Sequence, residues 1–146
     1  LVLYPILTVK EVIKYFLGIY GISSKKYNYW RDWGGIKEFE NRQIKHLSTG
    51  MLKKVMLLIS VISKPKVLFL DEPFSGLDPV QMKLLENVIV EFHKKEKGIY
   101  IISSHDIECL QNVCDKCLLL HNGQIREINM EEVDREEIAK ILSEGE

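Results

Sequence analysis

The chain has 146 residues, of which 46% are hydrophobic and 28% are charged, and its formal net charge is -1. This composition is typical of a globular domain with a real core, and its charge balance gives no basic stripe of the kind that nucleic-acid-binding proteins carry. The longest mainly apolar stretch, Val55–Ile62, is far shorter than the roughly 20 residues that cross a bilayer. The three cysteines, few and odd in number, favour a reducing cytosol over a disulfide scaffold.

The first part of the chain is predicted to be helical. Thr8 and Glu11 have the spacing of a capping box, and apolar residues then recur at helical spacing as far as Gly21. From Ser23 to Gly35 this periodicity is lost, and we interpret the segment as a loop with a short turn, whose aromatic side chains pack on one another. A short polar helix is expected over residues 38–46.

The middle of the chain is predicted to form a strand, a helix and a second strand. Ser48 begins a buried helix that is expected to end at about Ser63, because Pro65 follows. The apolar runs Lys66–Leu70 and Ile99–Ile102 are typical of parallel strands that are covered on both faces. A helix between two such strands predicts a right-handed βαβ unit.

The helix between these strands has clear end signals. Asp78 is a good N-cap with Pro79 at the first helical position, and Gly98 is expected to end the helix. Its expected apolar stripe consists of Val80, Leu84, Val88, Ile89 and Phe92.

The last part begins with a short helix after His105. A strand over residues 116–120 and another over 124–128 are expected to pair through a tight turn at Asn122 and Gly123. The tail, residues 130–146, is expected to form a C-terminal helix. The sequence therefore predicts an α/β fold with a mostly parallel sheet, divided into a helical subdomain (1–46), a core part (47–129) and this helix.

Two adjacent carboxylates give the strongest chemical signal. Asp71 and Glu72 directly follow an apolar strand, and the carboxyl ends of parallel strands are where α/β folds bind ligands. One carboxylate is enough to help hold magnesium, and a second beside it can act as a general base. The alternative is a strand that simply ends in a polar turn.

Three further segments are weaker signals when each is taken by itself. Leu47–Met51 is a small, glycine-containing turn at a helix N-terminus, which presents backbone N–H groups to an anion, although by itself Ser48 is better explained as an ordinary N-cap. Ser75–Asp78 forms a turn before the next helix. His105 follows the second strand, where it is able to contact a phosphate or play a structural part.

In this order, the four segments resemble the ABC transporter ATPase family: Leu47–Met51 matches its signature loop, Val67–Glu72 its Walker B element, Ser75–Asp78 its D-loop and His105 its H-loop. The resemblance covers residues 1–128. It implies a partial P-loop NTPase (ABC ATPase) fold and a chain that binds and hydrolyses ATP with Mg²⁺ to power transport. Sequence pattern alone makes this a motif hypothesis.

The resemblance also implies a role for each residue. Asp71 would serve magnesium, Glu72 would activate water and His105 would contact the γ-phosphate. The signature residues would touch the ATP of a second ATPase domain facing head to tail, and the D-loop would lie across that interface: Ser48, Thr49, Gly50 and Met51, and Ser75, Gly76, Leu77 and Asp78. A membrane permease would be the other partner, on the inner face of the cell membrane, and no nucleic acid is expected.

The sequence departs from the family pattern in two respects. Thr49 and Met51 replace the usual Gly and Gln of the signature, as in ABC-2-type exporters, which favours export. No Gly-x-x-x-x-Gly-Lys-Ser/Thr phosphate loop occurs in the chain, and without it nothing cradles the β-phosphate. Because the chain also lacks an initial Met, we expect a C-terminal part of a longer product that is inactive alone.

Two other functions fit some of these features. A non-transport relative in chromosome maintenance or DNA repair would share the signature and Walker B, but such relatives insert long coiled coils and no heptads are present here. A non-catalytic fragment that only binds a partner would explain the missing phosphate loop. Cys109, Cys114 and Cys117 lack a fourth ligand at zinc spacing, so we interpret them as structural thiols.

Overall fold

The first helix, α1 (Val9–Ile19), begins at the predicted capping box. The computed structural model describes residues 3–129. In it the Glu11 N–H donates to Thr8 Oγ at 3.2 Å, and the Glu11 carboxylate accepts from the Thr8 N–H at 2.8 Å. The hydrogen bonds that the Thr8 N–H and hydroxyl donate to this carboxylate favour its charged form and so lower the pKa of Glu11. The predicted helix and its cap are therefore confirmed.

The aromatic segment that follows is not a loop, so that prediction is wrong. It contains a 3₁₀ turn, η1 (Ser24–Lys26), and an α-helix, α2 (Tyr27–Trp33). Tyr27 and Trp30 lie three positions apart on one face and are both buried, at 5% and 3% exposure. The burial of these large side chains stabilises a helix that local sequence preference does not indicate.

The single polar helix expected over residues 38–46 is also wrong. Two short 3₁₀ turns stand there, η2 (Lys37–Phe39) and η3 (Ile44–His46). The backbone between them pairs with the start of α1, since the Val9 N–H donates to the Arg42 carbonyl at 3.0 Å and the Lys10 N–H to the Glu40 carbonyl at 2.8 Å. These carbonyls satisfy orphan N–H groups at the beginning of α1 and are not available for a helix of their own.

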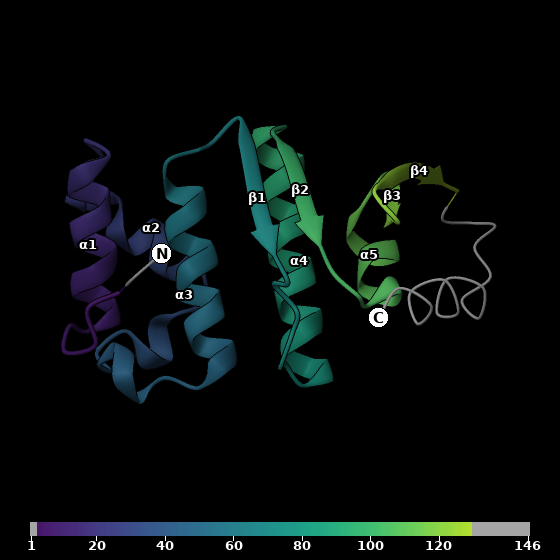
Figure 1. The fold of residues 1–146 in the computed structure, drawn as a ribbon. Coiled ribbons are helices and arrows are strands. Elements are labelled where there is room, and N and C mark those ends of the chain that lie inside the picture. The colour runs from purple at the N-terminus through teal and green to yellow at the C-terminus, as the bar shows by residue number, and fades with distance from the viewer. Residues whose placement is uncertain (1–2, 130–146) are drawn as a thin grey trace.

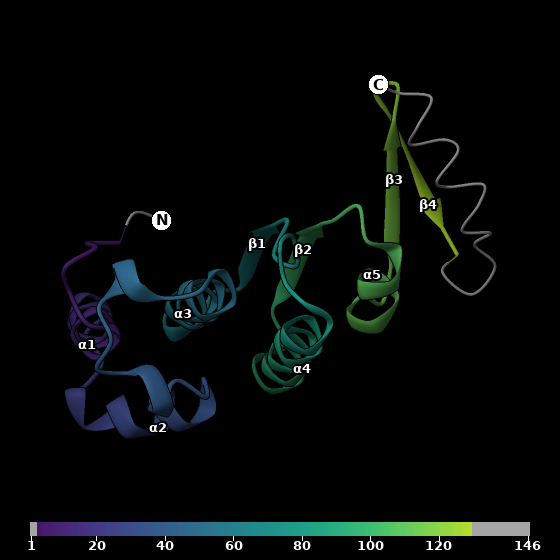
Figure 2. The ribbon, with the colours of Figure 1, turned by 90° about the horizontal axis from the view of Figure 1, so that it is seen from below.

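Helix α3 (Thr49–Ile62) begins after Ser48 and is capped at Ser63, as predicted. It packs against α1, and the two helices lie side by side in Figures 1 and 2. Its expected burial is confirmed by six buried residues: Val55, Leu57, Leu58, Ile59, Val61 and Ile62. This helix is the centre of the helical half of the core.

Strands β1 (Val67–Asp71) and β2 (Ile99–Ser103) pair in parallel, which confirms the predicted βαβ unit. The connecting helix, α4 (Pro79–Glu96), lies against one face of this sheet (Figures 1 and 2). The expectation that both faces are covered is wrong for the described residues, because Phe69 is 71% exposed and Ile101 is 50% exposed.

The buried face of α4 differs from the predicted stripe. Asp78 caps the helix as expected, its Oδ1 accepting from the Gln81 N–H at 2.9 Å. Val80 and Leu84 are exposed, at 70% and 49%. Ile89 and Phe92 are buried as predicted, and Leu85 and Glu86 are buried with them. Counting back from Phe92 in alternating steps of three and four reaches Ile89 and Leu85, so the predicted stripe began on a neighbouring face.

Gly98 does not end α4 in the way expected. Lys97 is the residue with the left-handed conformation at the C-cap, with φ of 52°. A Cβ atom on Gly98 would instead lie 3.0 Å from the Pro65 carbonyl oxygen and 3.0 Å from the ring of Tyr100. Gly98 therefore serves the close approach of two backbone segments at the start of the strands.

The last elements are α5 (Ile107–Val113) and an antiparallel hairpin of β3 (Cys117–His121) and β4 (Gln124–Ile128), as predicted. The hairpin forms a sheet separate from β1 and β2. A groove of about 690 Å³ lies between β2, α5 and β3. The C-terminal helix expected over 130–146 lies outside the described residues, and none of the described helices is long and apolar enough to cross a membrane.

We expect the chain to lose stability as the pH rises above about 8.5, which is the ordinary pKa of a cysteine thiol. Burial raises the pKa of Cys109 to about 12 and that of Tyr100 to about 12, and it also raises the pKa of Tyr27. Because the unfolded chain releases these protons at lower pH than the folded chain, stability that is present below about pH 8.5 is lost progressively toward pH 12.

Urea unfolding measured at several pH values between about 8 and 11 tests this expectation. The midpoint should fall steadily with pH, and Cys109→Ala should make the fall shallower. A midpoint that is independent of pH over this range would contradict it.

Candidate functional site

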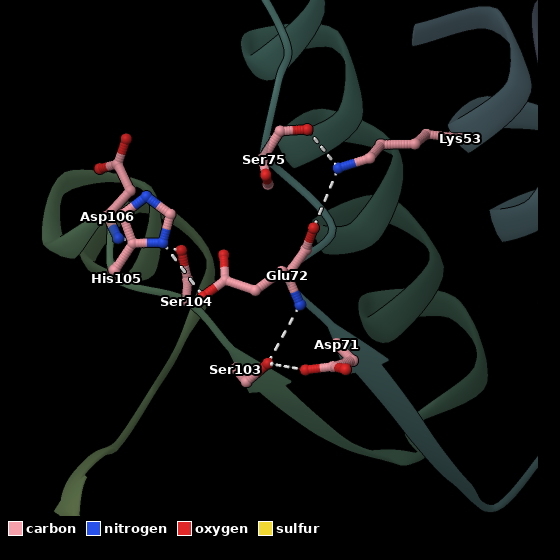
Figure 3. A network of polar contacts seen from close by, with 8 residues as sticks. All are labelled: Lys53, Asp71, Glu72, Ser75, Ser103, Ser104, His105 and Asp106. Atoms are coloured by element: carbon pink, nitrogen blue, oxygen red, sulfur yellow. Dashed lines mark hydrogen bonds and ion pairs between the residues drawn. The ribbon is translucent and has the colours of Figure 1, made fainter. Parts of the chain in front are cut away.

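The carboxyl ends of β1 and β2 bring the first site residues together. In the parallel register Asp71 lies opposite Ser103. Ser103 Oγ donates to Asp71 Oδ1 at 2.6 Å and accepts from the Glu72 N–H at 3.0 Å, and the Ser103 carbonyl accepts from the same N–H at 3.1 Å (Figure 3). A single serine thus holds the Asp71 carboxylate and the Glu72 backbone to the end of β2.

Glu72 has an unusual backbone conformation. Its φ is 44°, in the left-handed region that a residue with a Cβ adopts at a cost of about 1–2 kcal/mol. This conformation takes the chain out of the direction of β1, and the Glu72 carboxylate faces His105 in Figure 3, with 3.1 Å between Oε1 and Nδ1. His105 is itself 75% exposed, so this ring is open to a ligand.

Lys53 of α3 contacts the same loop from the opposite side. Its ammonium donates to the Glu72 carbonyl at 3.0 Å and also to the Ser75 carbonyl, as Figure 3 shows. Burial lowers the pKa of Lys53, and the nearby Glu72 carboxylate offsets only part of this shift. The contacts join the helix that follows Ser48 to the turn that follows the carboxylates.

The turn at Ser48 packs against the Ser75–Asp78 segment and the start of α4. Ser48 Oγ accepts from the Met51 N–H at 3.3 Å, so this residue is an N-cap, and the first N–H groups of α3 point outward without intrahelical partners. A Cβ on Gly76 would lie 4.0 Å from Thr49 Cγ2. A Cβ on Gly50 would lie 2.1 Å from Gln81 Oε1, so the end of the Gln81 side chain would have to move to admit a larger residue.

The four predicted segments thus form two neighbouring groups on this part of the molecule. One group contains Asp71, Glu72 and His105 with Ser103, and the other contains the Leu47–Met51 turn with the Ser75–Asp78 segment. In the second group Leu77, Gly50 and Met51 line a cavity of about 160 Å³ with residues of α4. The exposed members of these turns are Ser48, Thr49, Ser75, Gly76 and Asp78.

The first group provides oxygen ligands that fit magnesium. Asp71 is exposed, and Glu72 Oε2 is buried without a hydrogen-bond partner within the described part of the chain. Residues 3–129 contain no cluster of three or more acidic, histidine or cysteine side chains able to enclose a metal ion. Magnesium suits such a site, because it is usually bound by one or two carboxylates together with phosphates and water.

Two polar residues of the site, Ser103 and Lys53, have no role predicted from the sequence, and neither has Gln81 at the edge of the site. Ser103 lies two residues before His105, and its contact with Asp71 follows only from the strand register. No motif in the sequence includes Lys53 or Gln81. The spacing of Lys53 could have indicated its place, since it stands four positions after Thr49 and therefore on the same helix face.

Comparison with known proteins connects this geometry to one family. The family model described as "ABC transporter" matches residues 1–75. An uncharacterized ABC transporter ATP-binding protein of Methanocaldococcus jannaschii is 38% identical over 120 residues, which cover 80% of this chain and 45% of that protein. Another, from Alkalihalophilus pseudofirmus, is 35% identical over 136 residues, or 86% of this chain and 51% of that protein.

The fold is likewise similar to a solved structure. The chain matches a structure described as the ATP binding subunit of an ABC transporter with a TM-score of 0.74 and 26% identity, over 98% of this chain and 64% of that one. This likeness supports the predicted partial P-loop NTPase fold. The chain spans about half the length of the curated relatives that it matches.

Proposed function

Because the chain belongs to the ABC transporter ATP-binding family, we propose that it provides the catalytic carboxylate and the signature turn of an ATPase that powers a membrane permease. The observation that carries the proposal is the convergence of Asp71, Glu72 and His105 at the carboxyl ends of β1 and β2. That edge is where open α/β sheets bind their ligands.

Asp71 would hold magnesium in this proposal. Its Oδ1 is oriented by the Ser103 hydroxyl at 2.6 Å, which leaves the carboxylate fixed at the exposed end of the strand. ATP and Mg²⁺ would supply the phosphoryl group and a cation that neutralises its developing charge.

Glu72 would act as the general base. Its carboxylate lies beside a histidine, so Glu72 would take a proton from the attacking water while His105 would donate a hydrogen bond to a γ-phosphate oxygen. The two carboxylates have different partners, Ser103 for Asp71 and His105 for Glu72, so one would serve the metal and the other the water. Ser103 and Lys53 fix the backbone on which both depend.

The signature and D-loop residues would act on a second ATPase domain. The exposed N-terminus of α3, with Ser48 as its cap and Gly50 packed against Gln81, presents N–H groups to an anion. The adjacent D-loop residues are exposed on the same side of the site, where a head-to-tail partner would cover them. The permease partner and a place on the inner face of the membrane belong to the same proposal.

A chimera tests this function directly. A phosphate-loop half from another family member is fused ahead of Leu1, and steady-state release of phosphate from MgATP is measured. We expect turnover that falls by about 100-fold or more in the Glu72→Gln variant, because the general base is lost. Glu127→Gln is the matched control, since Glu127 is an exposed residue of β4 paired with Lys116 at 3.0 Å.

Equal turnover by the Glu72→Gln and Glu127→Gln chimeras would contradict the role of Glu72. A folded chimera that binds MgATP but does not hydrolyse it would contradict the proposed catalytic function as a whole.

A further inference from the structure

The turn between the carboxylate pair and the D-loop is held by an ammonium group from another element. Lys53 donates to two carbonyls of that turn, those of Glu72 and Ser75. The Glu72 carbonyl also accepts from the Ser75 N–H at 3.3 Å, which closes the turn on itself. Two carbonyl oxygens that face one cation are held by charge-assisted hydrogen bonds, which are stronger than bonds between neutral groups.

The position of Lys53 on α3 connects this turn to the signature. Thr49 and Lys53 are four residues apart and therefore lie on one face of the helix. That face is directed at the Glu72–Gly76 segment, because Thr49 lies beside Gly76 and Lys53 reaches the two carbonyls. A displacement of the head of α3 would therefore be transmitted to the backbone of Glu72.

The direction of the Glu72 side chain depends on this backbone. Its left-handed conformation is fixed on one side by Ser103, which contacts the N–H, and on the other by Lys53, which contacts the carbonyl. Release of the carbonyl lets the residue return to an extended conformation, and the contact between Glu72 Oε1 and His105 Nδ1 is then lost.

We propose that Lys53 is a positioning residue that couples the signature turn at the head of α3 to the carboxylate of Glu72. The inference rests on the proposed function, since that function gives the Glu72 carboxylate its role. The contact of Lys53 with the turn is tested without nucleotide. Nothing in the family resemblance assigns a part to this side chain.

The test uses the 146-residue chain and NMR. Lys53→Met removes the ammonium, and Lys53→Arg keeps a cationic donor. Lys54→Met is the matched control, because Lys54 is the next residue of the same helix, has a pKa that burial lowers as it does for Lys53, and lies near Gly35 and Glu38 instead of the turn. Glu72→Gln supplies the reference spectrum for a changed carboxylate beside His105.

In the Lys53→Met chain the two hydrogen bonds from the ammonium to the turn are lost. We therefore expect the turn to open more often, and the Ser75 amide to exchange with solvent about tenfold faster. The His105 ring resonances should move in the same chain. Lys53→Arg should restore both signals, and Lys54→Met should change neither. Lys53→Gln replaces Lys53→Met if the latter does not fold.

The proposal is overturned if the His105 resonances of the folded Lys53→Met or Lys53→Gln chain are unchanged. It is also overturned if amides throughout the chain show the same increase in exchange rate as Ser75, since that indicates a loss of global stability and not a local change at the turn. Because neither signal needs ATP, an inactive chimera would contradict the proposed function and leave this result standing.

Discussion

We expect the purified chain, titrated with a fluorescent ATP analogue and magnesium, to give no saturable binding below about 1 mM, which corresponds to a binding free energy of about −4 kcal/mol or weaker. The physical reason is that the sequence has no Gly-x-x-x-x-Gly-Lys-Ser/Thr loop, whose backbone N–H groups and lysine would hold the β-phosphate. The site residues that are present include the carboxylates of Asp71 and Glu72, which repel a triphosphate unless a metal ion intervenes.

The chimera that carries a phosphate-loop half is the matched control for this titration. It should bind the same analogue at least about 100-fold more tightly, which corresponds to about 2.7 kcal/mol. Micromolar binding by the chain alone would show that other residues replace the loop, and the assignment of a half-site would be wrong. Weak binding in both proteins would count against a nucleotide site at this sheet edge.

The largest loss of stability is expected from Phe92→Ala. Phe92 is 2% exposed, and its ring centroid lies 5.6 Å from that of Trp33 in α2 and 5.9 Å from that of Tyr100 in β2. The side chain thus joins the helical half of the core to the sheet half. Truncation of a buried Phe costs about 3–5 kcal/mol, against a total stability of about 5–15 kcal/mol for a domain.

Urea unfolding followed by far-UV circular dichroism measures this loss. Phe69→Ala is the control, because it removes the same atoms from a side chain that is 71% exposed on the open face of β1, and it should cost less than about 1 kcal/mol. Equal losses in the two variants would contradict the assigned core. They would also show that the open sheet face is covered in solution.

Much of the fold follows from local signals in the sequence. The capping box at Thr8, the N-caps Ser48 and Asp78, and the turn at Asn122 are short-range patterns, and the structure has each of them where the sequence predicts it. Each works through hydrogen bonds between residues close in the chain. The order of residues along the chain is therefore sufficient to predict these caps and this turn.

The incorrect predictions concern contacts between distant segments. Helix α2 packs against α1 and buries Tyr27 and Trp30, and the segment after it is shaped by hydrogen bonds to the start of α1. Long-range burial overrides weak local preference in both places. The open face of β1 and β2 was likewise not predictable, since strand composition indicates what suits burial and not what covers it.

The sequence by itself determined the family, the order of the four motifs and the two carboxylates at the end of a strand. The tertiary structure decided how these parts meet, since the strand register sets Ser103 against Asp71, and the packing of α3 brings Lys53 to the turn after Glu72. Motifs are read from residues adjacent in the chain, whereas the contacts of Ser103 and Lys53 span about thirty and twenty positions. Only the folded backbone fixes distances of that kind.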